Sequence, residues 1–532
     1  MNHALTLLFH RNRAIIPLVG LALVFLCQAT HADDRLRFPG WFTDHMVLQR
    51  DKNIHVWGWA KVGDMIQVSL GTEKENATAD SKGRWDVFFV PRPAGGPFVL
   101  KAESGSEQIQ VSDVLIGDVW VIGGQSNMNI AVRDGDEAVE AIKASTDDKL
   151  RLIHFPERPE WEPQIDNTAQ WEKASPQSVT TFSCVGYHFA RKLRGEMKDV
   201  PIGMIQAAVG STCAEAWLSR DALGQNQAFA HYLKDLDAVE AKYPEVKTSM
   251  VEMGTKWNRL RKDHIQAGID FRAGKLKERP PVNDAPYARA LPCLMHNGMI
   301  RPLQPFAIRG VIWWQGGSNA KPTEKAFEYR ELFPYLIETW RKEWGQGDFP
   351  FLFAQEPTLK WDFMEPGWMV VREAQLMTAQ KVKNTAIIIN SDQRYDKDPE
   401  LKHFPTKPVV GQRLALAALA LAYGKKVAFS GPLYDASRTK VEGAKMRIGF
   451  THAESGLKMR QGKLVDFEIA GDDRKFVKAQ ATIEGDTVVV WSEAVAHPRA
   501  VRYDWDTWTG ATLMNQAGLP ASPFRTDDWV ID

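Results

Sequence analysis

The sequence predicts an α/β protein whose mostly parallel sheet is flanked by two β-rich domains. Residues 38–112 contain short apolar runs separated by turn residues, a pattern typical of a small β-sandwich. Residues 117–424 alternate between apolar strands and helical stretches, which indicates a parallel sheet with helices on both faces. From residue 425 the strand-like pattern returns. We therefore predict domains over residues 33–112, 113–424 and 425–532.

The first 32 residues have the features of an export signal. Arg11 and Arg13 precede an apolar run over residues 14–26, and Ala32 supplies the small residue that a signal peptidase requires. The run is shorter than the ~20 residues of a membrane-spanning helix. We therefore predict a cleaved signal peptide over residues 1–32 and an exported protein, periplasmic or secreted. An uncleaved anchor is the alternative.

The charge of the chain argues against polyanionic partners. The whole chain carries 66 basic and 66 acidic residues, and without the predicted signal its net charge is about −2. We expect no binding to nucleic acid, and no membrane association after signal cleavage, because both need a basic surface.

The cysteines and tryptophans leave two questions open. Cys184, Cys213 and Cys293 form no Cys-x-x-Cys motif and no Cys/His cluster, so no metal site is predicted. One disulfide with one free thiol, and three buried thiols, are both compatible with this spacing. The chain has 19 tryptophans, which suit either sugar-facing surfaces or the core.

The first domain is predicted from its alternating runs and its turns. Strands are expected over residues 46–49, 54–59, 65–70 and 85–90. Turns are expected at Gly63-Asp64, at Ser81-Lys82-Gly83 and across the proline-rich residues 91–97.

The second domain supplies the predicted parallel sheet. After a first strand over residues 119–122, buried strands are expected at 200–208, 308–314, 351–355 and 385–390, with helices at 187–197, 330–344 and 410–423. A charged insertion at about 221–284 is expected to be helical, and no chemistry is assigned to it. In the third domain, strands are expected over residues 445–450 and 481–491.

Ser126 is the most prominent candidate for chemistry. An apolar strand over residues 119–122 runs into Gly123-Gly124-Gln125-Ser126, which places a hydroxyl at the C-terminal edge of the predicted sheet. Ligands bind at this edge in open α/β sheets. A serine here is either a nucleophile, if a base and oxyanion donors lie nearby, or only the N-cap of the next helix.

Three other segments lie at the ends of later strands or after the last one. Gly210 could direct its backbone N–H into a cleft, and Gln315 and Asn319 carry amides that could donate to an oxyanion or a sugar hydroxyl. His403 precedes a helix in a polar loop, which suits a general base. Each could instead have an ordinary structural role. Their positions nevertheless bring all of them to the same edge of one sheet as Ser126.

Several stretches also carry a family resemblance. They are Gly124-Gln125-Ser126-Asn127-Met128, residues 201–206, Glu215-Ala216-Trp217, Asn297-Gly298-Met299-Ile300, Gln315-Gly316-x-Ser318-Asn319, Arg372-Glu373-Ala374-Gln375, and residues 403–414 and 515–524. In their order and in their amino-acid sequences, these stretches resemble the conserved blocks of the sialate O-acetylesterase family, which is of the SGNH-hydrolase type. The resemblance extends from about residue 38 to the end.

The resemblance implies an SGNH-type, flavodoxin-like sheet and hydrolysis of O-acetyl esters on sugars, without a metal or organic cofactor. By position, Ser126 would be the nucleophile and His403 the base. The N–H groups of Ser126 and Gly210 and the amide of Asn319 would form the oxyanion hole. The side chains expected to contact substrate are those of Gln125 and Gln315.

Three positions depart from the family pattern. The family usually has Glu where this chain has Gly317, and commonly a second glycine where Ser211 stands. Its aspartate usually lies two residues before the histidine, where this chain has Leu401. Glu400 and Asp398 are the remaining candidates for the acid that orients the base, and a Ser-His dyad is the third option.

We predict a serine esterase that removes O-acetyl groups from sugars through an acetyl-serine intermediate. The substrate could be sialic acid or an acetylated plant polysaccharide, because nothing in the sequence identifies which sugar is bound. The alternative is a carbohydrate-binding protein on the same fold whose catalysis has lapsed. The oligomeric state is not predicted.

Overall fold

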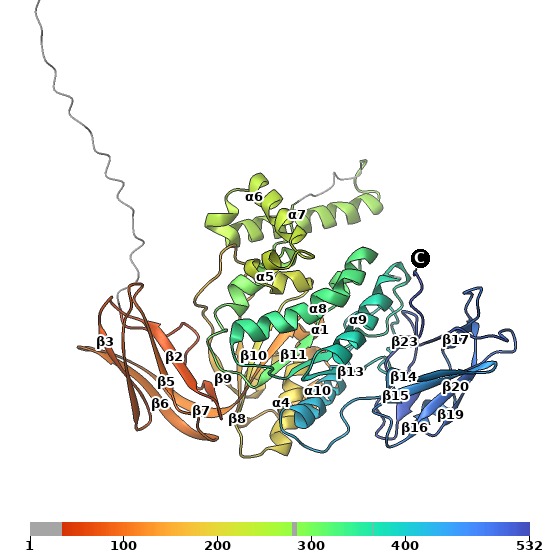
Figure 1. Ribbon diagram of the computed structural model, residues 1–532. Helices are drawn as coiled ribbons and strands as arrows, with labels where there is room; N and C mark the ends of the chain where they lie inside the picture. Colours follow the sequence, from red (N-terminus) through yellow and green to blue (C-terminus); the bar gives the residue numbers. More distant parts are fainter. Residues whose placement is uncertain (1–34, 279–284, 365, 532) are drawn as a thin grey trace, which may run out of the picture.

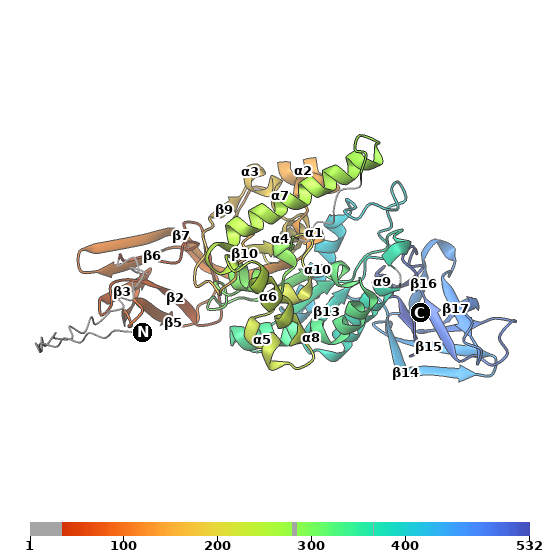
Figure 2. The same ribbon diagram turned by 90° about the horizontal axis from the view of Figure 1, so that it is seen from above.

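The computed structural model describes residues 35–278, 285–364 and 366–531. The predicted signal peptide lies outside these residues. The chain is a mixed α/β protein with a mixed central sheet and further β-sheets. Its two β-rich ends lie on either side of a central α/β part (Figure 1), and the same arrangement is visible from above (Figure 2). Within the described ranges, no helix combines the length and the apolar character that crossing a membrane requires.

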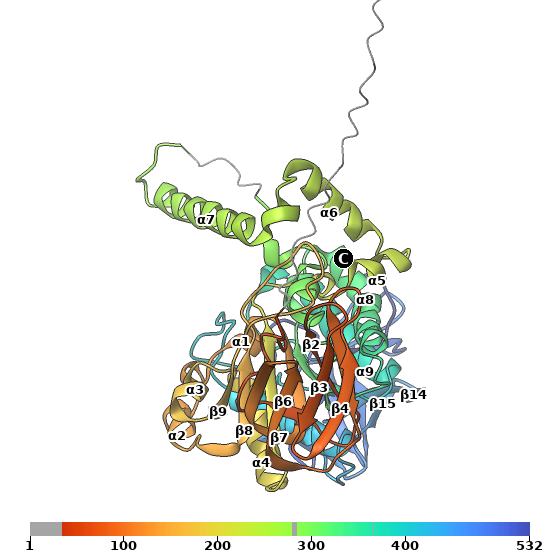
Figure 3. The same cartoon turned by 90° about the vertical axis from the view of Figure 1, so that its left-hand side faces the viewer.

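Apart from β1, which pairs in parallel with β7, the N-terminal strands form two small antiparallel groups. In one, β3 pairs with β4 and β6, and β6 pairs with β7; in the other, β2 pairs with β5. These strands cover the near side of Figure 3. Their bounds are β1 Val47–Gln49, β2 Ile54–Trp59, β3 Met65–Leu70, β4 Glu73–Thr78, β5 Arg84–Phe89 and β6 Gly95–Ser104. The sequence did not predict β4, because its side chains are polar and mostly exposed and so lack an apolar alternation.

One long strand, β7 (Glu107–Gly124), joins the N-terminal strands to the central sheet. Its first half pairs with β6, and its second half lies between β10 and β11 as a parallel neighbour of both. The sequence predicted only residues 119–122 of this strand, because only that part is a continuous apolar run. Along the sheet the order is β13-β12-β11-β7-β10-β8-β9, and only β9 is antiparallel to its neighbour.

Helices cover both faces of this sheet, and β7 shows why. Trp120 and Ile122 belong to an apolar cluster that includes residues of α4 and α10, whereas Val119 and Val121 belong to another that includes residues of α8 and α9. Because successive side chains of a strand point to opposite faces, an unbroken apolar run requires cover on both. The other strands of this sheet are β8 Asp147–His154, β9 Trp171–Ala174, β10 Ile202–Ala208, β11 Gly310–Trp314, β12 Phe351–Ala354 and β13 Thr385–Ile388.

Several helices begin at an earlier residue than the sequence predicted, and some are longer. α8 begins at Thr323 rather than at 330, and α4 begins at Cys184, where the side chain of Ser183 caps it. Residues 221–284 contain most of three helices, α5 to α7, which rise above the sheet in Figure 1. The α-helices are α1 Ser126–Asn129, α2 Ala138–Lys143, α3 Pro176–Thr180, α4 Cys184–Glu196, α5 Arg220–Gln225, α6 His231–Lys242, α7 Val246–Arg272, α8 Thr323–Trp344, α9 Gly367–Lys381 and α10 Lys407–Leu421.

The C-terminal strands form small antiparallel sheets. The predicted strand over residues 481–491 is a hairpin of two strands, because Gly485 adopts a φ of 67° and reverses the chain. The bounds are β14 Leu433–Glu442, β15 Lys445–Thr451, β16 Leu457–Met459, β17 Phe467–Ala470, β18 Val477–Lys478, β19 Gln480–Glu484, β20 Thr487–Trp491, β21 Ala500–Tyr503, β22 Leu513–Asn515 and β23 Phe524–Arg525.

Candidate active site

Three neighbouring strands end side by side at the candidate site. Gly124, the last residue of β7, lies opposite Ala208 at the end of β10 and Trp314 at the end of β11. Gly124 has a φ of 116°, and a Cβ added there would lie 2.3 Å from the carbonyl oxygen of Trp314. Only glycine fits this turn. The backbone N–H of Gln125 then donates to the same carbonyl at 2.9 Å, so Ser126 becomes the first residue of α1.

Gly210 lies directly beside Ser126. A Cβ added to Gly210 would be 3.5 Å from the Cβ of Ser126, so the two backbones are in close approach. No hydrogen bond within the described part of the chain occupies the backbone N–H of Ser126 or of Gly210. Two free N–H groups beside a half-buried hydroxyl are what stabilisation of an oxyanion requires.

Ser211, the residue after Gly210, has a backbone conformation that glycine adopts more easily. Its φ is 62°, in the left-handed region that a residue with a side chain adopts at a cost. The chain therefore holds the Gly210 turn in a strained conformation, and a glycine at position 211 would adopt it freely.

Asn319 is held rigidly by its neighbours. It lies in the short 3₁₀ turn Gly317–Asn319 after β11 and is fully buried. Its Oδ1 accepts hydrogen bonds from the N–H of Ala214 at 2.9 Å and from Nε2 of Gln315 at 2.7 Å, and its Nδ2 donates to Glu215 at 2.9 Å. Glu215 is itself paired with Lys325 at 3.0 Å. These contacts fix which amide atom is the donor, and they leave one N–H of Nδ2 for another acceptor.

The two predicted glutamines occupy different environments. Gln315 is fully buried, and its amide contacts Asn319, the carbonyl of Thr212 and the hydroxyl of Tyr329. It lies behind Asn319 rather than at a surface. Gln125 is also fully buried, but neither its Oε1 nor its Nε2 has a protein partner within the described residues. Of these two glutamines, Gln125 is therefore the one whose side-chain amide can still form hydrogen bonds.

His403 lies in the loop before α10, with an exposed imidazole. The two following residues tie this loop to the strand ends. The ring of Phe404 is 6.2 Å from the ring of Trp314, and the carbonyl of Pro405 accepts from the N–H of Asp136 at 2.8 Å. No hydrogen bond joins the imidazole to Ser126 in the described part of the structure. The loop is thus close to the site, while the imidazole has no hydrogen-bond partner among the described residues.

Neither candidate acid forms a hydrogen bond or an ion pair with His403 in the described part of the chain. The Oδ1 of Asp398 accepts from the backbone N–H of Glu400 at 3.2 Å, which closes a local turn. The side chain of Glu400 is exposed, and only its carbonyl is engaged, by Nε1 of Trp361 at 3.1 Å. Among the described residues, no ion pair links the imidazole to either carboxylate.

The electrostatics around His403 favour its neutral form. Loss of hydration and the positive charges of Lys407 and Lys402 lower the pKa of the imidazole. A neutral imidazole is the form that can accept a proton from a hydroxyl.

Both the sequence and the fold are similar to those of known proteins. Residues 116–251 and 289–420 match the family model described as carbohydrate esterase, sialic acid-specific acetylesterase. The chain belongs to this family of carbohydrate esterases. It is 27% identical to the sialate O-acetylesterase of Mus musculus over 96% of this chain and 97% of that one, and 25% identical to that of Homo sapiens over 95% of each. Its structure resembles a carbohydrate acetylesterase from Xanthomonas citri with a TM-score of 0.78 and 34% identity, over 93% of this chain and 100% of that one.

Sequence reasoning missed two buried charged residues of this carbohydrate esterase. Glu356 follows β12 and is 1% exposed; its Oε1 accepts from the N–H of Gly317 at 2.8 Å, and its Oε2 has no partner within the described residues. Lys407 begins α10 with its Nζ fully buried over the rings of Trp314 and Phe404, at 5.0 and 3.5 Å from their centroids. Glu356 follows a predicted strand, so the strand-end argument that found Ser126 could also have found it.

Burial shifts both of these groups toward their neutral forms. Loss of hydration raises the pKa of Glu356 and lowers the pKa of Lys407 to about 7. Their mutual attraction opposes both shifts, although no direct ion pair joins them in the described part of the chain. The esterase therefore has an electrostatically coupled acid and base under the loop that carries His403.

The three cysteines within the described residues, Cys184, Cys213 and Cys293, are free thiols. Cys184 and Cys293 are buried and Cys213 is partly exposed, so the structure decides in favour of three thiols over one disulfide. Across residues 35–278, 285–364 and 366–531, no group of three or more His, Cys, Asp or Glu side chains is arranged to hold a metal ion.

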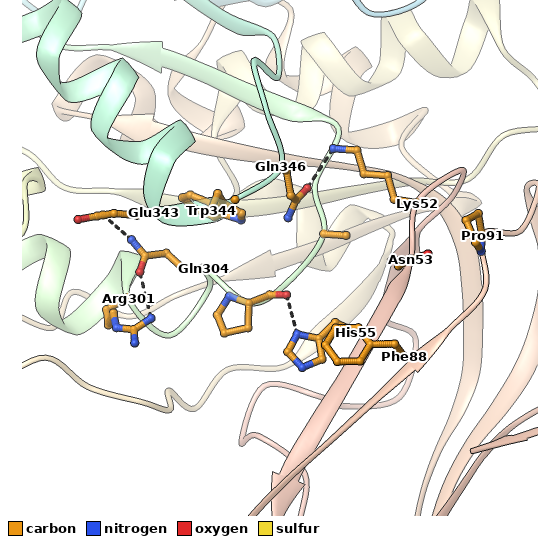
Figure 4. A pocket seen from close by; sticks show the side chains of 13 residues that line it. Lys52, Asn53, His55, Phe88, Pro91, Arg301, Gln304, Glu343, Trp344 and Gln346 are labelled. Atoms are coloured by element: carbon orange, nitrogen blue, oxygen red, sulfur yellow. Dashed lines mark hydrogen bonds between the residues drawn. The ribbon is translucent and has the colours of Figure 1, made fainter. Parts of the chain in front are cut away.

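A pocket of about 770 Å³, shown in Figure 4, has none of the candidate-site residues in its lining. One of its lining residues, Lys52, donates from Nζ to the carbonyl of Ile308 at 3.0 Å. Ile308 precedes β11, whereas Asn319 follows it, so this pocket is at the opposite edge of the sheet. In α/β sheets the reaction site is at the carboxyl edge, where Ser126 lies.

Proposed function

We propose that this carbohydrate esterase hydrolyses O-acetyl esters of sugars through an acetyl-enzyme formed on Ser126. The observation that carries the proposal is the close approach of Ser126 and Gly210, whose backbone N–H groups are both free. Membership of the carbohydrate esterase family supports the reaction class. Its relatives include a sialate O-acetylesterase and a carbohydrate acetylesterase, which supports an acetylated sugar as substrate.

In the first half of the reaction, the Oγ of Ser126 attacks the acetyl carbonyl carbon while His403 accepts the hydroxyl proton. The N–H groups of Ser126 and Gly210 and the free N–H of Asn319 donate to the oxyanion. The C–O bond to the sugar then breaks, and the sugar oxygen takes the proton from His403. In the second half, water attacks the acetyl group with the same assistance, which releases acetate and restores Ser126.

The acid that orients His403 is proposed to be Glu400, with Asp398 as the second candidate. Neither touches the imidazole here, so a Ser-His dyad is the competing proposal. Substituting each acid singly by alanine distinguishes them: a loss of kcat in only one variant identifies the acid, and full activity in both supports the dyad.

Gln125 is proposed to bind the substrate, which is supported by its two amide atoms without partners beside Ser126. Gln315 was predicted in the same role. Its complete burial and its bonds to Asn319 and Tyr329 favour the narrower proposal that it holds Asn319 in place.

We propose that the central sheet is of the SGNH, flavodoxin-like type. Leaving β8 and β9 aside, the strand order β10-β7-β11-β12-β13 is second-first-third-fourth-fifth along the chain, which is the flavodoxin order. The domain bounds proposed are residues 33–112, 113–424 and 425–532. Export after cleavage of residues 1–32, to the periplasm or the medium, is also a proposal, as is the absence of nucleic acid and membrane partners.

The test uses 4-nitrophenyl acetate and acetylated sugars, sialic acid and plant polysaccharide included, with the wild type and Ser126→Ala. We expect acetate release by the wild type and a loss of at least ~10³-fold in kcat in the variant. Equal rates in both proteins would show that Ser126 is not the nucleophile. Binding of sugars without any turnover in the wild type would favour a lapsed, carbohydrate-binding protein.

A further inference from the structure

We propose that a groove in the C-terminal β region, lined by Trp505 and Trp508, binds sugar units of a longer chain whose acetylated unit is held at Ser126. The proposal rests on the proposed function. It commits the enzyme to an acetylated oligosaccharide or polysaccharide rather than to a single free sugar.

The distribution of tryptophan is the first observation. Fourteen of the 19 tryptophans of the chain are buried, so most of them serve the core. The five that are partly exposed are Trp361, Trp491, Trp505, Trp508 and Trp529. All of them follow β12. Water-facing indole rings cost hydrophobic free energy, and in a carbohydrate esterase their flat apolar faces suit the C–H faces of pyranose rings.

The groove has the composition of a sugar site. Its volume is about 400 Å³, within the range of about 300–1,000 Å³ found for small-ligand sites. Besides the two indoles it is lined by groups that can bond hydroxyls, among them Asp466, Glu468 and Lys478. Aromatic faces beside carboxylate acceptors and an ammonium donor can bind a polyhydroxylated ring from its face and from its edge.

The groove is joined to the segment that carries His403. The N–H of Leu359 donates to the carbonyl of Thr507 at 2.8 Å, which ties the loop after β12 to the segment between Trp505 and Trp508. Two residues along that loop, Nε1 of Trp361 donates to the carbonyl of Glu400 at 3.1 Å. The ammonium of Lys402, adjacent to His403, lies 5.3 Å from the Trp361 ring.

A second link runs along the chain ahead of His403. The guanidinium of Arg394 lies 5.0 Å from the ring of Trp508. Arg394 and Asp396 line a smaller pocket of about 230 Å³ that shares Val465 and Asp466 with the groove. The tryptophan groove and this smaller pocket therefore adjoin each other, and both contact the segment that leads to His403, which is the direction a bound sugar chain would take.

The larger pocket of Figure 4 provides the matched control. Its exposed aromatic residue, Phe88, is 56% exposed and lies on β5, which pairs with β2 outside the central sheet; the pocket itself adjoins the residue before β11, at the amino edge of that sheet. Phe88→Ala removes an exposed ring that cannot contact a sugar chain held at Ser126.

The experiment measures acetate release from a chemically acetylated glucose, an acetylated cellotriose and an acetylated cellohexaose, with 4-nitrophenyl acetate as the substrate without a sugar chain. Wild type, Trp505→Ala, Trp508→Ala and Phe88→Ala are compared. For the wild type we expect kcat/KM to rise with chain length. In both tryptophan variants we expect KM for the hexaose to increase about three- to tenfold, the amount typical of one lost aromatic contact, with 4-nitrophenyl acetate hydrolysis unchanged.

Direct binding gives a second readout that does not depend on turnover. Unacetylated cellohexaose is titrated calorimetrically into Ser126→Ala with and without Trp508→Ala, and weaker binding in the double variant supports the groove. Equal kcat/KM for glucose and hexaose esters, or an effect of Phe88→Ala equal to that of Trp508→Ala, would overturn the inference while leaving the esterase intact. Absence of any ester hydrolysis by the wild type would instead overturn the proposed function.

Discussion

The carboxylate of Glu356 accepts a hydrogen bond from the backbone N–H of Gly317 at 2.8 Å. The family usually carries a glutamate at position 317, and in this chain a Cβ at that position would already lie 2.9 Å from the ring of Trp368. The neighbouring strand therefore supplies a buried carboxylate beside the position that lacks one. Gln125 borders the same space, since its Nε2 is 3.3 Å from the Cβ that Gly317 lacks.

Replacement of Glu356 by leucine should destabilise the protein, because it leaves the buried N–H of Gly317 without an acceptor. We expect a loss of about 1–3 kcal/mol in the free energy of unfolding, measured by denaturant titration. Glu356→Gln is the matched control: it keeps an acceptor oxygen and removes only the charge. If the leucine and glutamine variants are equally stable, the hydrogen bond to Gly317 contributes nothing.

Ser211→Gly should raise stability or leave it unchanged, in contrast to most substitutions near an active site. The φ of 62° at this position costs a residue with a side chain about 1 kcal/mol, which glycine avoids but partly gives back through its greater freedom in the unfolded chain. Thermal unfolding and kcat are measured together. A marked fall in both would show that the hydroxyl of Ser211, rather than its backbone, matters.

Asn319→Ala should lower kcat by ~10²–10³ with a smaller change in KM, because an oxyanion donor acts on the transition state. Glu215→Gln is the informative comparison. It preserves an acceptor for Nδ2 of Asn319 and breaks the ion pair with Lys325, so we expect a smaller loss of kcat. A KM effect in Asn319→Ala without a kcat effect would assign this amide to ground-state binding instead.

Lys407→Met should move the acidic limb of the kcat/KM profile to higher pH. The charge of Lys407 lowers the pKa of His403, and the base must be neutral, so removal of that charge raises the pH at which the base becomes active. The groups whose charges act on Lys407 are Glu356, Asp136 and the thiol of Cys184. Lys402→Met tests the second, smaller effect in the same assay, and an unshifted limb in both variants would contradict this electrostatic account.

The same substitution should stabilise the protein most at low pH. The pKa of Lys407 is about 7 in the folded state and 10.5 when the side chain is exposed. The free-energy cost of burying this side chain therefore rises as the pH falls from 10.5 toward 7. Relative to the wild type, Lys407→Met should gain on the order of 4 kcal/mol at about pH 6 and roughly 2 kcal/mol at about pH 9. Chemical denaturation at the two pH values measures this difference. A gain independent of pH would reflect packing alone.

The sequence was sufficient to predict the structure where a local pattern is compatible with only one kind of element. The unbroken apolar run before Gly124 predicted a strand covered on both faces, and the glycine turn predicted the position of Ser126. Strand β4 escaped prediction, because a charged edge strand has no apolar face to reveal it. The hairpin at Gly485 was read as one strand, although the polar residues Glu484 and Asp486 on either side of this glycine are typical of a turn.

The sequence by itself determined the class of the protein, and it predicted the edge of the sheet at which the chemistry lies and the order in which Ser126, Gly210, Asn319 and His403 follow along the chain. These follow from periodicity and from residues that end strands. Only the tertiary structure decided which groups touch. It brought Gly210 to Ser126, set Asn319 between Gln315 and Glu215, and buried Glu356 and Lys407. Within the described residues it gave the imidazole no hydrogen bond or ion pair to Asp398 or Glu400. The reason is that side-chain contacts join residues far apart in the chain, and such pairings depend on packing that no local pattern records.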